Sequence, residues 1–187
     1  PINWAIINGA NHTGVTTFKL QHEIDTGDIL LSKRIDIKEQ TTAGMLHDEI
    51  AAVGAEVLLQ TVQQLCEGTI HPNPQYFEAE LKHAPKIFTE TCQIDWGQSV
   101  KAIYDLIRGL SPYPTSFTYL GKLKIKIFGA AKEESMPETA PGSFETDGKT
   151  FLKFACSNGY IHLLDVQLEG KKRMQIEDFL RGYRFEK

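Results

Sequence analysis

Three carboxylates lie within one short segment, HEIDTGD, at Glu23, Asp25 and Asp28. Clustered carboxylates can accept and release protons, so this segment holds candidate groups for acid–base chemistry. Thr26 and Gly27 follow Asp25 directly, and a small residue pair lets backbone amides approach a ligand closely. The same composition also fits an ordinary solvated turn, in which Asp, Thr and Gly are common.

Metal and histidine chemistry have weaker support. The carboxylate cluster lacks the ligand count of a calcium loop, and the six histidines form no HxH or HExxH pattern. The three cysteines are widely separated, without a CxxC pair, which is typical of a reducing cytoplasm and argues against a zinc ribbon. We therefore expect no metal site, and we interpret His22 as a surface residue rather than a catalytic one.

A second candidate site is basic. In KLKIKIF the residues Lys122, Lys124 and Lys126 alternate with apolar residues, so a strand would place the three ammonium groups on one face, about 6.8 Å apart. Such a ridge could follow a phosphate backbone. An exposed strand face whose charges prevent edge-to-edge pairing is the alternative interpretation.

Two further groups of basic residues could also bind phosphates. GKKRM contributes Lys171, Lys172 and Arg173, and Arg108 lies at a helix end beside the SPYP turn. Lysine and arginine in such places bind phosphates without reading base sequence. No aromatic residues alternate with them in the sequence, so we expect phosphate contacts rather than base stacking.

The distribution of charge supports a polyanionic partner for the back half. The net charge is -4, but residues 1–70 hold 4 Lys or Arg and 9 Asp or Glu, whereas residues 98–132 carry six basic residues and one acid. The chain is 41% hydrophobic, enough for one substantial core or two small ones. No apolar run reaches about 18 residues, so we expect no membrane span.

The front of the chain has the pattern of an α/β domain. Residues 1–9 predict a short helix, residues 14–20 and 28–37 predict two strands, and apolar residues between Leu46 and Leu65 recur at helical spacing. Gly68 is a plausible end for that helix. Strand, loop, strand and long helix are typical of the end of an α/β domain, which we place at residues 1–70.

The rest of the chain predicts a linker and a small β domain. Residues 71–97 contain three prolines and weak periodicity, so we interpret them as an extended linker. Within residues 98–187 we predict helices at 99–110 and 176–182, an acidic loop at 133–148, and strands at 116–120, 123–128, 150–156 and 160–167. Short strands of this kind favour a small OB-like β-barrel.

Several motifs together resemble one family. IDTGD resembles the signature of folate-dependent formyltransferases, and PINWAIING resembles the helix that follows their histidine-containing active-site segment. APKI, IDW, IRGLSPYP and LEGKKRM resemble, in order and spacing, the linker and C-terminal domain of methionyl-tRNA formyltransferases. The resemblance covers essentially the whole chain.

This resemblance implies the end of a Rossmann-like formyltransferase domain followed by an OB-like tRNA-binding domain. It implies transfer of a formyl group from 10-formyltetrahydrofolate to the amino group of methionyl initiator tRNA, in the cytoplasm, without a metal or an obligatory protein partner. Of the family's active-site Asn, His and Asp, only the aspartate maps here, onto Asp25. We therefore expect a fragment that lacks part of the active site and is inactive alone.

The resemblance also implies binding residues. Folate contacts are expected at His22, Glu23, Ile24, Thr26 and Gly27, and tRNA contacts at Arg108, Lys122, Lys124, Lys126, Lys171, Lys172 and Arg173. Three other functions stay open: a sugar or ribonucleotide formyltransferase, a folate-dependent hydrolase domain of a larger dehydrogenase, and a non-catalytic nucleic-acid-binding module. The basic clusters argue against the first, and the IDTGD loop argues against the last.

Overall fold

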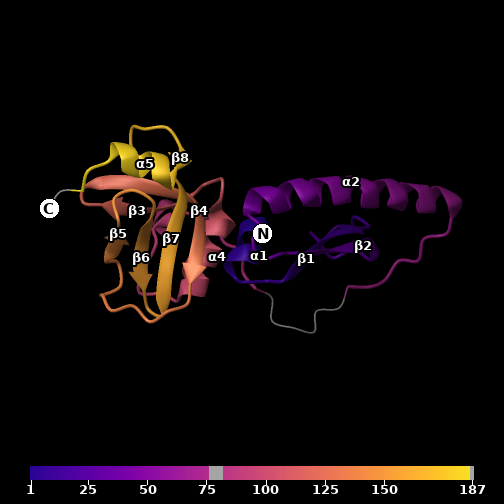
Figure 1. Ribbon diagram of the computed structural model, residues 1–187. Helices are drawn as coiled ribbons and strands as arrows, with labels where there is room; N and C mark the ends of the chain where they lie inside the picture. Colours follow the sequence, from indigo (N-terminus) through magenta and orange to yellow (C-terminus); the bar gives the residue numbers. More distant parts are fainter. Residues whose placement is uncertain (76–81, 186–187) are drawn as a thin grey trace. The chain divides into compact units, whose positions relative to one another are not determined.

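The computed structural model describes residues 1–75 and 82–185. The chain forms two compact units (Figure 1). We call one the sheet unit, which contains Pro1–Gly9, Thr42–Gly44 and Lys86–Lys187. The other, the hairpin unit, contains Ala10–Thr41 and Met45–Pro85. The two units do not divide the chain at one point, because its first nine residues pack with the sheet unit.

The hairpin unit is built on two antiparallel strands, β1 (His12–Phe18) and β2 (Ile29–Asp36). They confirm the two strands predicted at the front of the chain, with β1 beginning two residues earlier. The long helix α2 (Ala43–Glu67) confirms the helix predicted from apolar residues at helical spacing, and Gly68 follows it with a φ of +69°. The side-chain hydroxyls of Thr17 and Thr61 lie 2.8 Å apart in a hydrogen bond that joins β1 to α2.

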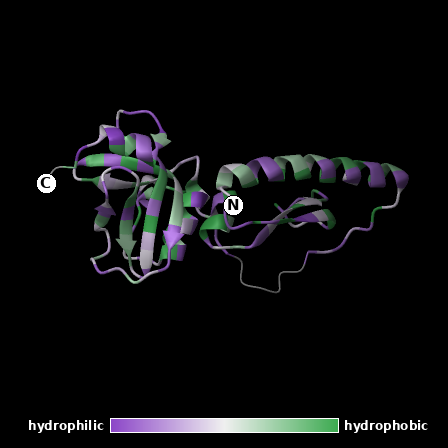
Figure 2. Ribbon diagram, viewed as in Figure 1, coloured by the Kyte–Doolittle hydropathy of each residue, from purple (hydrophilic) through white to green (hydrophobic). Residues whose placement is uncertain are grey.

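Helix α2 has a buried side and an exposed apolar side. Val57 and Thr61 are 2% and 3% exposed, whereas Leu58, Leu59 and Leu65 are more than half exposed. Hydrophobic residues recur along the length of the helix (Figure 2), and they lie on both its buried and its exposed side. Burial of a large apolar side chain contributes about 1.5–3 kcal/mol. Because these leucines are exposed, their side chains contribute little of this stabilisation to the hairpin unit.

In the sheet unit, two helices pack directly together. Helix α1 (Ile2–Ile7) confirms the predicted N-terminal helix, and α4 (Val100–Leu110) confirms the predicted helix before the SPYP turn. The side-chain amide of Asn3 donates to the carbonyl of Gly109 at 2.8 Å. A Cβ at Gly109 would lie 2.6 Å from Ile7 Cγ1, so glycine permits this close approach.

A six-stranded antiparallel sheet forms the body of this unit. The strands run in the order β3-β4-β7-β6-β5, and β8 pairs with β7. Their bounds are β3 (Ser116–Leu120), β4 (Leu123–Glu133), β5 (Phe144–Thr146), β6 (Leu152–Cys156), β7 (Gly159–Leu168) and β8 (Met174–Gln175). The sheet curls, and β4 has an irregular register near Gly129. Helix α5 (Ile176–Gly182) follows β8.

Most predicted elements of the back half are confirmed, and three were missed. The strand β5 lies in the segment expected to be an acidic loop, and the helix α3 (Thr89–Cys92) lies in the expected linker. Strand β8 has two residues, too few for any periodicity to show. Residues 76–81 of that expected linker lie outside the described residues.

The core lies between α4 and one face of the sheet. Ile103 and Ile107 of α4 are 1% exposed, and Ile125 and Ile127 of β4 are fully buried with them. The helix begins at an N-cap, since Ser99 Oγ accepts from the amide of Ala102 at 3.2 Å. The alternation that buries Ile125 and Ile127 turns Lys124 and Lys126 away from the core.

Candidate functional site

The first candidate site is the segment 22–28, which we call the aspartate loop. Asp25 has a φ of 60°, in the left-handed region that non-glycine residues rarely adopt. The side-chain amide of Gln75 donates to the carbonyl oxygens of Asp25 and Gly27, at 3.0 and 2.6 Å. The hydroxyl of Thr26 donates to the carbonyl of Glu23 at 3.1 Å. A side chain 50 residues away therefore holds the backbone on both sides of Thr26.

Gly27 determines how tightly the aspartate loop closes. A Cβ at this position would lie 1.5 Å from the carbonyl oxygen of Lys19, so no other residue fits. The amide of Lys19 donates to the carbonyl of Asp28 at 2.9 Å and continues the pairing of β1 with β2. The loop is thus closed where the two strands meet it, and the position of Asp25 follows from the hairpin.

The side chains of the aspartate loop point outward from the hairpin unit. His22, Glu23, Asp25 and Thr26 are exposed, and Ile24 is 89% exposed, whereas the backbone of Gly27 is buried. The predicted folate contacts are consecutive in the sequence, and the structure places them on one loop whose side chains are exposed. An exposed carboxylate on a fixed backbone can accept a proton or a hydrogen bond from a neighbouring group.

The second candidate site joins two basic segments that are distant in sequence. Strand β4 pairs with β7, which places Lys126 opposite Gln167, and the amide of Glu169 donates to the carbonyl of Lys124 at 2.9 Å. The side-chain amide of Gln167 donates to the carbonyl of Lys171 at 3.0 Å. Lys124 and Lys126 therefore lie beside the turn that carries Lys171 and Lys172, and we call these four residues the lysine face.

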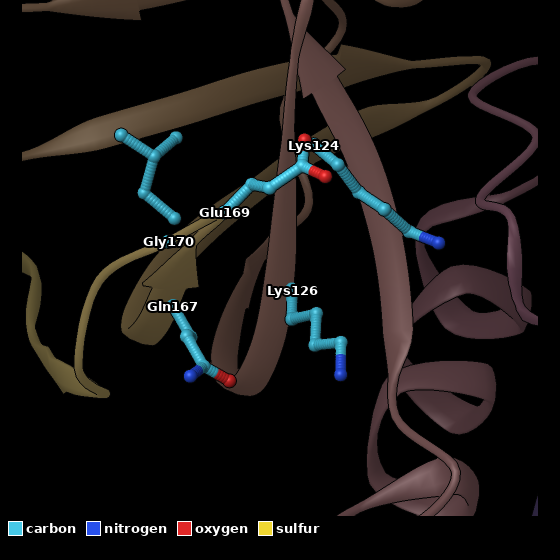
Figure 3. A pocket seen from close by; sticks show the side chains of 6 residues that line it. Lys124, Lys126, Gln167, Glu169 and Gly170 are labelled. Atoms are coloured by element: carbon cyan, nitrogen blue, oxygen red, sulfur yellow. The ribbon is translucent and has the colours of Figure 1, made fainter.

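A hollow of ≈ 340 Å³ opens on the lysine face, lined by Lys124, Lys126, Gln167, Leu168, Glu169 and Gly170. Figure 3 shows the two lysine side chains extending from the same strand. The Lys124 ammonium lies 3.6 Å from the centroid of the Phe117 ring, a cation–π contact that orients it. Within the described residues, Lys126 makes no ion pair, so its charge is available to an anion.

Two of the predicted basic residues lie elsewhere. Lys122 is not on the strand: it occupies the β3–β4 turn with Gly121, so only two of the three predicted lysines share the β4 face. Arg173 binds Asp165 with two nitrogens, at 2.9 and 2.5 Å, and its guanidinium lies 4.2 Å from the centroid of the Phe128 ring. Arg173 therefore anchors the turn of the lysine face to β7.

Arg108 requires a larger correction. It is 8% exposed, and its Nε donates to Oδ1 of the buried Asp105 at 2.7 Å. Asp105 also accepts from Lys101 at 2.5 Å. A guanidinium in this position is not available at the surface, so Arg108 stabilises α4 instead of lining the lysine face. The i,i+3 spacing of Asp105 and Arg108 on one helix was the signal in the sequence.

Sequence reasoning missed Gln75, Phe117 and Gln167, which hold the two candidate sites in place. Gln75 acts on Asp25, 50 residues away, Phe117 acts on Lys124 in the next strand, and Gln167 acts on Lys171, four residues away across a turn. No local pattern in the sequence marks such residues. In the part of the chain that the structure describes, no group of three His, Cys, Asp or Glu residues could hold a metal ion. Among the same residues, no helix is long and apolar enough to cross a membrane.

Comparison with known proteins shows similarity along nearly the whole chain. The methionyl-tRNA formyltransferase of Phocaeicola vulgatus is 46% identical over 98% of this chain. The matched part is 60% of that protein, so the chain spans about three fifths of the curated relatives' length.

Solved structures share the fold. HypX from Aquifex aeolicus in complex with tetrahydrofolic acid has a TM-score of 0.69 and 19% identity, over 96% of this chain and 32% of that one. An N-formyltransferase from Helicobacter canadensis in complex with folinic acid and dTDP-3-aminofucose has a TM-score of 0.68 and 16% identity, over 92% of this chain and 60% of that one. The fold is therefore that of an α/β formyltransferase.

Two family models divide the chain between them. Residues 1–62 match the model described as formyl transferase, and residues 86–184 match the model described as formyl transferase, C-terminal domain. The first includes the aspartate loop, and the second includes α4, the curled sheet and the lysine face. The chain therefore belongs to the formyl transferase family.

Proposed function

We propose that this chain is part of an enzyme that transfers a formyl group from 10-formyltetrahydrofolate to the amino group of methionyl initiator tRNA. The observation that carries this proposal is the 46% identity with a methionyl-tRNA formyltransferase over 98% of the chain. The cytoplasm is the compartment where such an enzyme would serve translation initiation.

The aspartate loop fits a folate. Two structures that share the fold were solved with tetrahydrofolic acid and folinic acid. Gly27 packs against the carbonyl of Lys19 and so fixes the loop backbone. The exposed residues His22, Glu23, Ile24 and Thr26 would then line the cofactor. When bound, the folate supplies the formyl group.

Asp25 would hold the proton that the reaction releases. The attacking amine loses a proton when it acquires the formyl group, and a carboxylate can accept that proton through water or orient a neighbouring histidine. Gln75 holds the left-handed backbone at Asp25, which fixes the point from which the carboxylate extends. Fixed geometry of this kind is what an acid–base group needs.

The lysine face would hold the tRNA. Lys124, Lys126, Lys171 and Lys172 are point charges that suit phosphates, and none of them selects a base. We infer a tRNA-binding domain of OB-like shape at residues 98–187, joined through 71–97 to the catalytic part at 1–70. Arg108 has no part in this surface, because it is buried against Asp105.

A hybrid protein tests the catalytic assignment. The part of the Phocaeicola vulgatus relative that this chain does not span would be joined to this chain, and formylation of methionyl-tRNA by 10-formyltetrahydrofolate would be measured. Asp25→Asn should lower turnover by at least about 100-fold with tRNA affinity intact. Asp36→Asn, an exposed carboxylate on the same hairpin, is the matched control. Near-normal turnover of Asp25→Asn, or a hybrid that formylates only an amino sugar nucleotide, would overturn the proposal.

Binding of tRNA to the chain itself tests the lysine face. Affinity should fall steeply with salt, because each neutralised phosphate releases counterions. Replacing Lys124 and Lys126 by Ala should reduce the magnitude of the log–log salt slope by about 2, whereas Lys149→Ala, in the β5–β6 turn at the other end of the sheet, should leave it unchanged. The wild-type chain should bind initiator and elongator tRNA about equally. A tenfold preference for initiator tRNA would contradict a phosphate-only surface.

A further inference from the structure

A second hollow in the sheet unit is lined by aromatic rings. It encloses ≈ 570 Å³, and its lining residues are Leu120, Gly121, Lys122, Leu123, Phe144, Tyr183 and Phe185. We call it the aromatic hollow. Its rings come from β5 and from the segment after α5, so the sequence holds no run of aromatic residues that would reveal it. No aromatic residues alternate with the basic clusters in the sequence, but the fold brings these rings beside Lys122.

The rings of the aromatic hollow stand at an angle to one another and are anchored from behind. The Phe144 and Phe185 centroids are 5.1 Å apart with planes tilted by 34°, and Tyr183 meets Phe185 edge-on at 5.0 Å. Behind them, Phe144 packs on Phe154 of the core at 5.8 Å, and Tyr183 stacks on Phe179 at 4.9 Å. Rings held in this way lose little conformational entropy when a flat ligand stacks on them.

One cation lines the aromatic hollow, and a second is next to its rings in the sequence. Lys122 lines it, and Arg184 lies between its two C-terminal rings in sequence. Both are exposed, and within residues 1–75 and 82–185 neither forms an ion pair. The nearest acid along β5, Glu145, is 3.5 Å from Lys153 and so is already paired. An apolar peptide would leave Lys122 without a partner, whereas a nucleotide offers a flat base for the rings and a phosphate for the ammonium group.

We propose that the aromatic hollow binds one unpaired nucleobase of an RNA, with the base stacked on the aromatic rings and its phosphate at Lys122. This inference rests on the proposed function, since tRNA is the RNA in question. Lys122 is two residues from Lys124 on the β3–β4 hairpin, so one RNA strand can continue from the hollow to the lysine face. The hollow thus adds contact with a base to a surface that otherwise holds only phosphates.

The test compares two labelled RNA hexamers, hexaadenylate and an abasic hexamer with the same phosphates, by fluorescence anisotropy with the intact chain. Stacking of one base on an aromatic ring should make hexaadenylate bind about 5- to 150-fold more tightly. The double variant Tyr183→Leu, Phe185→Leu should lose this preference without a change in salt slope. Tyr183→Trp should retain it, and Phe151→Leu, a ring outside the hollow, is the control.

The outcomes separate this inference from the proposed function. Equal binding of both hexamers by the wild-type chain would overturn the inference, and so would a double variant that keeps the preference while its tryptophan fluorescence shows a folded sheet unit. If the preference fails but tRNA binding still depends on Lys124 and Lys126, only the aromatic hollow is refuted. If the preference holds but tRNA does not bind, the proposed function fails and the base site stands.

Discussion

Replacing Arg108 by Met should destabilise the sheet unit without weakening tRNA binding. Arg108 is 8% exposed and Asp105 is 4% exposed, and their charged groups lie 2.7 Å apart. Removing one partner of a buried ion pair costs about 3–5 kcal/mol, because the other charge stays buried. Lys101 still contacts Asp105 at 2.5 Å, so we expect the lower end, about 3 kcal/mol.

The measurement is urea unfolding followed by tryptophan fluorescence. Both tryptophans, Trp4 and Trp96, lie in the sheet unit, so the signal reports the unit that contains Arg108. With a slope of about 1–3 kcal/mol per molar urea, the midpoint should fall by roughly 1–3 M. The double variant Asp105→Leu, Arg108→Met should recover much of that loss, since no unpaired charge is left in the core.

Lys172→Met is the matched control, because Lys172 is exposed and belongs to the lysine face. It should change stability by less than about 0.5 kcal/mol and reduce the salt slope of tRNA binding by about 1. The reasoning would be refuted by the reverse pattern, with Arg108→Met stable and its salt slope reduced. Arg108 would then be a phosphate contact, as its position beside the SPYP turn first indicated.

Three further outcomes follow from named contacts. Gly27→Ala should open the aspartate loop, because its Cβ would lie 1.5 Å from the carbonyl oxygen of Lys19, and hydrogen exchange of the amides in segment 19–28 should become faster. The control is Gly54→Ala, whose Cβ would meet Val15 at 3.7 Å and which should leave that exchange rate unchanged. Hydrogen bonds, chiefly from Ser135, lower the pKa of Glu133 from 4.5 to about 2. The stability that the Glu133 carboxylate contributes is therefore present above pH 4.5 and lost as the pH falls toward 2. The urea midpoints of Glu133→Gln and the wild type should converge over that pH range. The amides of α2 should exchange faster than those of β4 and β7, because much of its apolar surface is exposed, and equal protection would contradict this.

Much of the secondary structure could be read from local patterns. Alternation in KLKIKIF predicts β4, and the Ser99 cap followed by apolar residues at helical spacing predicts α4, because these preferences act between near neighbours. The turn at the aspartate loop could also be predicted, because Asp, Thr and Gly are common in turns, whereas its role toward a ligand stays a prediction. Elements of two to four residues, such as β8, escape such reading because they are shorter than the period of any pattern.

The surface chemistry depended on contacts between distant segments. The sequence by itself determined that Lys124 and Lys126 turn away from the core, but the pairing of β4 with β7 decided that they join Lys171 and Lys172. Tertiary packing decided that Arg108 is buried and that Gln75 holds the aspartate loop. It also gathered the rings of the aromatic hollow beside Lys122. The physical reason is that strand register and burial are set by the partner across the contact, which local sequence does not specify.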